Sequence, residues 1–209
     1  MCYRLAMLRV GLTGGIATGK STVSRLFMEC GARLIDADVL SRDAVRPGAP
    51  ACREIAAAFG AEMLRPDGSV DRERLAASVF ADSAKRARLE AIIHPYVFAG
   101  EERLFREITA ADPRAVVLFD AALLIETGAH KHKDRVVVVT ADEPTQLRRL
   151  MDRDKLPEDE ARRRIRSQMP LAEKVKVADY VIDGTLPIER LRAEVRRIYG
   201  ELKQQSKKG

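Results

Sequence analysis

The stretch Val10-Gly-Leu-Thr-Gly-Gly-Ile-Ala-Thr-Gly-Lys-Ser-Thr-Val23 decides how this chain folds. Its first residues, Val10 to Leu12, predict a short buried strand. The residues from Ser21 to Met28 predict a helix that carries its apolar side chains on one face. A glycine-rich turn therefore joins a strand directly to a helix.

This turn follows the pattern G-x-x-x-x-G-K-[ST], with its fixed residues at Gly14, Gly19, Lys20 and Ser21. Glycines let the backbone wrap so that its N–H groups surround phosphate oxygens, and the positive end of the helix adds to that field. Such a turn can simply reverse the chain, but a lysine in the first helical turn is unfavourable unless an anion lies there. The residues expected to hold nucleotide phosphates are Gly14, Gly15, Ile16, Ala17, Thr18, Gly19, Lys20, Ser21 and Thr22.

Two residues of this turn have separate expected tasks. Lys20 would reach the outer phosphates of a nucleotide, and the hydroxyl of Ser21 suits a magnesium ion. A second magnesium contact is expected from Asp120, because it ends the apolar run Ala115 to Phe119, which is typical of a strand covered on both faces.

The composition describes one substantial core with insertions: 209 residues, of which 46% are hydrophobic and 33% charged. The net charge of +6 suits nucleic acid or a polyphosphate substrate equally well. However, the chain has no Trp and no interleaving of basic and aromatic residues of the kind that stacks bases. Nucleic acid is therefore the weaker interpretation.

The chain shows no apolar run long enough to span a membrane and no secretory signal. Cys2, Cys30 and Cys52 have neither metal nor disulfide spacing, which suits a reducing cytoplasm. We expect a cytoplasmic protein, a monomer or weak homo-oligomer, with unstructured tails at residues 1–6 and 206–209.

Asp36 and Asp38 follow a brief strand at Leu34 and Ile35. Residues two apart on a strand share a face, so both carboxylates are expected to point the same way. Ligands of parallel sheets bind at the carboxyl ends of strands, which is where these acids lie. Alternatively, Asp38 merely caps a helix over residues 39–45.

The section from 45 to 110 has no strand pattern and is predicted to be a helical insertion between two strands. Expected helices cover residues 51–60, 71–80 and 82–94, and after an interruption at His94-Pro95 the helix resumes over 96–109. His94 is the one histidine in an apolar context. A histidine there is usually packed or capping, and the alternative is a ligand contact.

Two further strands, Arg135 to Thr140 and Asp179 to Asp183, frame a section crowded with arginines. Arg149 and Arg153 lie four residues apart and so share one helical face. Most of these charges are expected to be solvated. Phosphoryl transfer nevertheless needs positive charge over the transferring group, and arginine is the usual donor. The chain is expected to end in a helix over 187–202.

Taken together, several stretches resemble the dephospho-coenzyme A kinases, and they cover the chain from Met7 to about Leu202. They are Gly11-Leu-Thr-Gly-Gly-Ile, Gly19-Lys-Ser-Thr-Val, Ile35-Asp-Ala-Asp, Pro47-Gly, Asp67-Gly, His94-Pro95, Leu123-Leu124, Gln146-Leu and Ala178-Asp-Tyr-Val-Ile. The P-loop alone would not identify the family, whereas its joint occurrence with Asp-Ala-Asp and His-Pro does so well.

The resemblance implies a P-loop kinase fold, a three-layer α/β/α arrangement with a five-stranded parallel sheet. The nucleotide-binding core would comprise residues 7–44, 111–150 and 173–205. Residues 45–110 would form a helical acceptor-binding insertion, and residues 151–172 a mobile lid. It also implies the reaction, in which ATP with Mg²⁺ phosphorylates the 3′-hydroxyl of the dephospho-coenzyme A ribose to give coenzyme A and ADP.

The resemblance further implies residue roles. Asp38 would orient or deprotonate the acceptor hydroxyl. Arg153, with Arg149 as a second candidate, would neutralise the transferring phosphoryl group, and Lys20 would be catalytic through the outer phosphates. The residues implied to line the acceptor site are Asp36, His94, Pro95, Leu123 and Leu124. The chain departs from the family pattern at Ala17-Thr18, at Ala122 and at Asp183-Gly184, near the expected adenine pocket.

Two rival functions remain open at this point. One is a kinase of another small acceptor, such as a nucleoside monophosphate or shikimate, against which the His94-Pro95 insertion argues. The other is a regulatory or nucleic-acid-stimulated P-loop NTPase.

Overall fold

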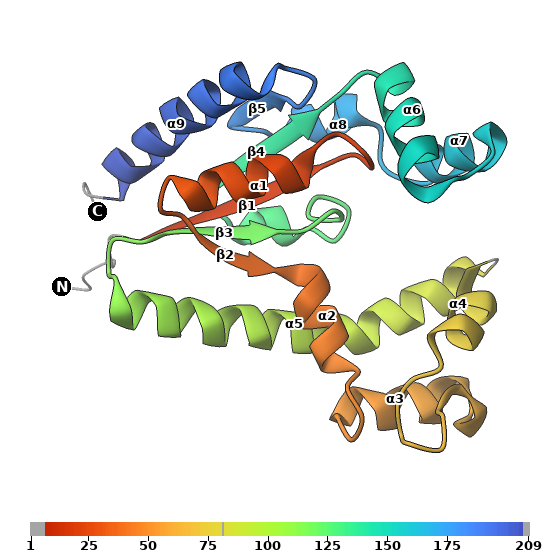
Figure 1. Ribbon diagram of the computed structural model, residues 1–209. Helices are drawn as coiled ribbons and strands as arrows, with labels where there is room; N and C mark the ends of the chain where they lie inside the picture. Colours follow the sequence, from red (N-terminus) through yellow and green to blue (C-terminus); the bar gives the residue numbers. More distant parts are fainter. Residues whose placement is uncertain (1–6, 81, 207–209) are drawn as a thin grey trace. The chain divides into compact units, whose positions relative to one another are not determined.

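A computed structural model describes residues 7–80 and 82–206, and its central feature is a five-stranded sheet (Figure 1). The strands follow the order β2-β3-β1-β4-β5. They span β1 Leu8–Gly14, β2 Arg33–Asp36, β3 Val116–Asp120, β4 Arg135–Thr140 and β5 Tyr180–Asp183. The predicted strands are thus confirmed, and β1 is longer than its apolar run because Thr13 and Gly14 continue the pairing.

The strand β1 lies at the centre and pairs in parallel with both β3 and β4. Leu12 is level with Asp120 on β3, and Gly14 is level with Val139 on β4. The glycine-rich turn and the acid at the end of β3 therefore leave the same edge of the sheet.

The nine α-helices of the described residues account for most of the remaining chain. They are α1 Lys20–Glu29, α2 Ala37–Ala44, α3 Pro50–Phe59, α4 Arg72–Phe80, α5 Ser83–Ala111, α6 Glu143–Asp154, α7 Glu158–Arg166, α8 Leu171–Val175 and α9 Ile188–Gln205. Two 3₁₀ turns, Ala61–Met63 and Ala129–His132, complete the elements. No helix of residues 7–80 and 82–206 combines the length and apolarity that crossing a bilayer would take.

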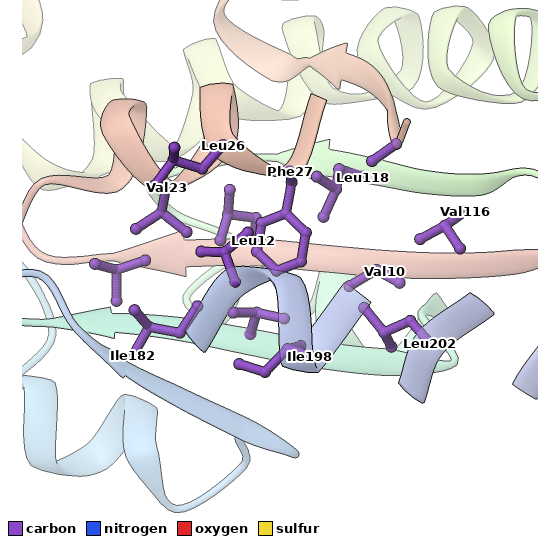
Figure 2. Close-up of a cluster of buried hydrophobic side chains, with 14 of the residues drawn as sticks. Val10, Leu12, Val23, Leu26, Phe27, Val116, Leu118, Ile182, Ile198 and Leu202 are labelled. Carbon is purple, nitrogen blue, oxygen red and sulfur yellow. The ribbon is translucent and has the colours of Figure 1, made fainter. Parts of the chain in front are cut away.

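The largest hydrophobic core lies where α1 and α9 pack on one face of the sheet (Figure 2). Phe27 of α1 is fully buried and points toward β1, where Leu12 is also fully buried. Ile198 and Leu202 of α9 close this core. The packing fixes α1 relative to β1, and so fixes the two ends of the glycine-rich turn.

The chain divides into two compact units, one made of the residues up to Ile35 and from Glu107 onward, the other of Asp36–Arg106. The second unit has its own small core of Cys52, Ile55, Met63, Val70 and Leu75. As expected, it is helical, apart from an isolated bridge between Leu64 and Val70 around the turn at Pro66.

Two helix predictions were wrong in their boundaries. The predicted interruption at His94-Pro95 is absent, because α5 runs from Ser83 to Ala111 with Pro95 inside it. A helix tolerates such a proline when the rest of its hydrogen bonds and its packed face are retained. The fully or nearly buried Val97 and Phe105 on the C-terminal half of α5 supply that packing.

The last helix, α9, continues to Gln205 rather than ending near Leu202. Beyond it Ser206, expected to be in an unstructured tail, is buried, and its hydroxyl donates to the carbonyl of Arg114. Residues 1–6, 207–209 and Cys2 lie outside the described residues.

We predict that Phe27→Ala lowers the free energy of unfolding by about 3–5 kcal/mol, because it leaves a cavity in the core of Figure 2. Met28→Ala is the matched control, because that side chain on the same helix is 42% exposed. Urea denaturation followed by circular dichroism measures both variants. Equal stability of the two variants would contradict this account of the core.

Candidate active site

The turn after β1 has the conformation of a P-loop. Gly19 has φ 96° and Ala17 has φ 58°, so two residues adopt the left-handed region. Glycine adopts this region readily, whereas alanine does so at a cost. Thr18 is fully buried and its hydroxyl donates to the Gly15 carbonyl at 2.9 Å, which closes the turn on itself.

Side chains distant in sequence satisfy the peptide groups of this loop from outside. The Ile16 amide donates to Gln168 Oε1 at 2.7 Å, and the Ile16 carbonyl accepts from Gln146 Nε2 at 2.6 Å. Arg149 donates to the carbonyls of Ala17 and Thr18 at 3.4 and 3.3 Å. Since these groups are satisfied elsewhere, the loop is held in shape before any ligand arrives.

The turn after β5 packs directly against the P-loop. A Cβ atom added at Gly184 would overlap the carbonyl oxygen of Thr18 and lie 3.0 Å from Val139 Cγ1. The Gly184 carbonyl also accepts from Arg149 Nη2 at 3.0 Å. Only glycine permits this approach of two backbone segments.

Lys20 forms an ion pair with a carboxylate of the same chain. Its Nζ forms an ion pair with Oδ1 of Asp120, whose side chain is only 9% exposed. The parallel register of β1 and β3 produces this contact, because each strand ends beside the other. The positive charge at the start of α1 is thereby balanced.

A cavity of about 370 Å³ lies beside the loop. Its lining residues are Ala17, Gly19, Ser21, Thr22, Arg149, Arg153, Gly184, Leu186, Ile188 and Leu191. The mixture of apolar side chains, backbone and two arginines suits a nucleotide, with its phosphates toward the P-loop. The structure thus brings Arg149 and Arg153 to one cavity.

The two arginines have different partners there. Arg153 donates two hydrogen bonds to the neighbouring Asp154, at 2.7 and 3.1 Å. These bonds lower the pKa of the Asp154 carboxyl and raise that of the Arg153 guanidinium. Arg153 is held by one carboxylate, which Arg164 also contacts, whereas Arg149 is engaged by three backbone carbonyls.

The loop after β3 contains the two leucines expected at the acceptor. Leu123 is 42% exposed, whereas Leu124 is fully buried and packs against Gly11. The fully buried Lys174 fixes this loop, because its Nζ lies 2.8 Å from Glu126 and donates to the Ala122 carbonyl at 2.9 Å.

In the Asp36–Arg106 unit, the two acids after β2 have unequal roles. Asp36 is the N-cap of α2, since its Oδ1 accepts from the amides of Asp38 and Val39 at 2.8 and 3.1 Å. The expected shared strand face and the alternative of an Asp38 cap are both wrong, because the chain turns into a helix at Asp36. Asp38 is exposed in the first turn, and its carboxylate accepts no hydrogen bond from residues 7–80 or 82–206.

His94 and Pro95 lie in the same unit, on α5. The His94 ring is partly buried and meets the ring of Phe98 edge to face, with centroids 6.3 Å apart. Phe98 itself is 41% exposed and Pro95 is exposed. These residues present a partly apolar surface of the helix to solvent.

Sequence reasoning missed the residues that support the P-loop. Gln168, Lys174 and the close-packing Gly184 gave no local pattern, because their partners lie between 35 and 166 residues away in the chain. The one signal for these residues in the sequence is the glycine at position 184, directly after a predicted strand, where a close approach of two backbone segments is common.

A five-stranded sheet with a P-loop after its central strand, and a lysine at the start of the following helix, defines a P-loop kinase of the α/β class. The chain matches the family model of dephospho-CoA kinase over residues 8–188. It therefore belongs to the dephospho-CoA kinase family.

Relatives and solved structures agree with this assignment. The chain is 45% identical to the dephospho-CoA kinase of Corynebacterium efficiens, over 94% of this chain and 98% of that one. It is 47% identical to that of Geobacter sulfurreducens, over 92% and 97%. Among solved structures, TT1252 from Thermus thermophilus matches with a TM-score of 0.78 at 32% identity, covering 93% and 97% of the two chains. Dephospho-CoA kinase from Campylobacter jejuni matches with a TM-score of 0.62 at 25% identity, covering 94% and 98%.

We predict that Gly184→Ala lowers ADP affinity at least about tenfold, because about 1.4 kcal/mol suffices and the new methyl group must displace the Thr18 peptide. Titration calorimetry with ADP measures this effect. The control is Gly200→Ala, since a Cβ at Gly200 meets nothing within 4 Å and alanine favours the helix by roughly 0.5–1 kcal/mol. Wild-type ADP affinity in Gly184→Ala would refute the importance of this contact.

Proposed function

We propose that this chain transfers the γ-phosphoryl group of ATP to the 3′-hydroxyl of the ribose of dephospho-coenzyme A, giving coenzyme A and ADP. The observation that carries this proposal is the family match over residues 8–188, which includes both the P-loop and the acidic turn at Asp36. The likeness extends to relatives that bear this activity in their names, over nearly the full length of the chain.

On the donor side, residues Gly14 to Thr22 hold the phosphates of ATP through backbone N–H groups. The adenine base of ATP occupies the cavity beside Gly184 and Leu186. Lys20 exchanges its ion pair with Asp120 for contacts to the outer phosphates, which carry more negative charge than one carboxylate. Ala17, at which the chain departs from the family pattern, adopts the left-handed conformation within the loop.

The residues that would hold Mg²⁺ are Ser21 and Asp120. The Ser21 side chain is exposed in the first turn of α1, beside the cavity, and Asp120 ends the neighbouring strand β3. A hydroxyl and a carboxylate are the hard oxygen ligands that this ion prefers, together with phosphate oxygens. When bound, the ion would neutralise charge on the outer phosphates of ATP.

On the acceptor side, Asp38 either accepts the proton of the 3′-hydroxyl or orients that hydroxyl so that a lone pair of its oxygen faces the γ-phosphorus of ATP. Its exposed and unbonded carboxylate supports this role. A loose phosphoryl-transfer transition state demands little proton removal, so a carboxylate that positions the hydroxyl is sufficient. Asp36 acts on the acceptor only through its cap, which orients the first turn of α2.

The remaining acceptor contacts follow from exposure. Leu123 keeps accessible surface in one unit, and His94 and Pro95 keep it in the other, so we assign each of them a contact to the acceptor. Leu124 is buried and supports the loop that carries Leu123. We assign the helical residues 45–110 as the acceptor-binding domain.

Of the two arginines, Arg153 is the better candidate for the transferring phosphoryl group. The Arg153 side chain is 59% exposed and its partner is a side chain, so its guanidinium can turn toward an anion, while Arg149 is held by the loop backbone. We assign residues 151–172 as the lid, which excludes water and prevents wasteful hydrolysis of ATP. We further propose that the enzyme acts in the cytoplasm as a monomer or weak homo-oligomer.

The principal test is coenzyme A formation by the purified protein from dephospho-coenzyme A and MgATP, followed by chromatography. A nucleoside monophosphate and shikimate serve as rival acceptors. Phosphorylation of a rival in preference to dephospho-coenzyme A would overturn the proposal. So would ATP hydrolysis that requires nucleic acid and declines steeply with salt.

We predict that Asp38→Asn lowers kcat at least about hundredfold while the affinity for ATP stays unchanged, because the carboxylate acts on the acceptor alone. Steady-state kinetics and ATP titration measure the two effects. Glu189→Gln, an exposed carboxylate of α9, is the control and keeps full activity. Full activity of Asp38→Asn would show that this aspartate has no role in the reaction.

We predict that Lys20→Ala lowers turnover by about 10²–10³-fold or more, since it removes the charged donor closest to the outer phosphates. Lys85→Ala, which changes an exposed lysine of α5, retains wild-type turnover. A thermal melt verifies folding, because Lys20→Ala also leaves Asp120 without its ion pair. Turnover within tenfold of the wild type would exclude Lys20 from the transition state.

A further inference from the structure

An arginine-lined cavity of about 380 Å³ lies in the Asp36–Arg106 unit, and the proposed function does not account for it. Four arginines and a single carboxylate contribute to its wall. The lining residues are Arg42, Val45, Arg46, Pro47, Arg65, Ser69, Val70, Arg72 and Glu73. Such a concentration of guanidinium groups is typical of a site for phosphate oxygens.

The backbone under two of these arginines is fixed by tight turns. Arg46 begins the turn Arg46-Pro-Gly-Ala49, in which the Ala49 amide donates to the Arg46 carbonyl at 2.9 Å and Gly48 has φ 80°. The Cys52 thiol donates to the same carbonyl at 3.1 Å. Arg65 begins the second turn, closed by Gly68 N to Arg65 O at 2.9 Å and Arg65 N to Ser69 O at 2.8 Å. Both side chains therefore start from rigid points, which reduces the entropy lost when they bind.

The acids nearby do not cancel this charge. Asp43 takes one contact from Arg46, at 2.7 Å to Nη2, and a guanidinium has four further N–H donors. Asp71 lies 3.8 Å from Arg65 but accepts the Arg74 amide at 3.1 Å and so caps α4. That hydrogen bond lowers the pKa of the Asp71 carboxyl. The side chains of Arg46 and Arg65 remain 72% and 52% exposed and are available to a ligand.

A hydrogen bond connects the lining of the cavity to Asp38, the residue proposed to act on the acceptor hydroxyl. Arg42 lies one turn after Asp38 on α2, and its Nε donates to the Asp38 carbonyl at 3.1 Å. Four residues of an α-helix span about 6 Å along its axis. Two groups of one ligand that are separated by a few bonds can therefore contact Asp38 and Arg42 at the same time. In dephospho-coenzyme A the 3′-hydroxyl and the 5′-diphosphate are attached to the same ribose.

We propose that the cavity lined by Arg42, Arg46, Arg65 and Arg72 binds the 5′-diphosphate of the acceptor while Asp38 faces its 3′-hydroxyl. This inference rests on the proposed function and names the part of the substrate that selects it. The arginines set the position of the ribose on α2. An acceptor without a diphosphate lacks this anchor.

The test measures binding of dephospho-coenzyme A to the full chain saturated with a non-hydrolysable ATP analogue, which blocks the donor site. Arg46→Gln combined with Arg65→Gln removes two charges but keeps side chains of polar character. We expect the Kd to rise about 10- to 100-fold in total, which is about 1.4–2.8 kcal/mol, because both side chains are more than half exposed and solvent weakens their contacts to an anion. The control Arg53→Gln changes an exposed arginine of α3 outside the cavity and keeps the wild-type Kd.

Adenosine, measured by competition under the same conditions, shows whether the diphosphate is the group recognised. Its Kd should differ by less than about twofold between the wild type and the double variant, because adenosine has no diphosphate for the arginines to bind. Equal loss for both ligands would overturn the proposal, and so would an unchanged Kd for dephospho-coenzyme A.

The two proposals fail in different ways. Coenzyme A formation by the wild type, with undiminished acceptor affinity in the double variant, would overturn the arginine site alone. Arginine-dependent binding without coenzyme A formation would overturn the proposed function alone. A wild type that does not bind dephospho-coenzyme A would overturn both.

Discussion

The P-loop depends on peptide groups that are satisfied by side chains from distant parts of the chain. Gln168 accepts from the Ile16 amide, and Gln146 donates to the Ile16 carbonyl. Arg149 donates to the next two carbonyls of the loop. Each of these bonds fixes a peptide plane, and a fixed plane aims the remaining N–H groups. A loop preorganised in this manner binds anions without first losing conformational entropy.

The same contacts join the loop to the segment proposed as the lid. Gln146 and Arg149 belong to the part of α6 that precedes residue 151, where the lid begins, and Gln168 lies within the lid just after α7. The apolar cluster of Leu147, Leu150 and Ala161 packs against Ile16 and Ala17. Movement of the lid would therefore be transmitted to the loop through the Ile16 peptide, where both a hydrogen bond and apolar packing converge.

The sequence was sufficient for features that depend on neighbouring residues. Continuous apolar runs such as Val136 to Val139 predict strands because a parallel sheet buries both faces. The P-loop pattern predicts its own geometry for the same local reason. Boundaries failed where tertiary contacts decide them: buried residues keep α5 continuous through Pro95, and the Arg114 carbonyl accepts from Ser206 beyond the end of α9.

The site was less predictable because its contacts are distant in sequence. Lys20 was expected to need an anion, but nothing local indicated that Asp120, 100 residues later, meets it in the structure. For Asp36 and Asp38, the alternation of side chains along a strand predicted both carboxylates on one face. In the structure, the N-cap hydrogen bonds of Asp36 instead start a helix between the two residues. That outcome separates their roles, because Oδ1 of Asp36 accepts both hydrogen bonds of the cap, whereas the carboxylate of Asp38 accepts none from the described residues. The helix that Asp36 starts then carries Asp38 and Arg42 on the same face, so a single cap determines where both the hydroxyl and the diphosphate of an acceptor would be held.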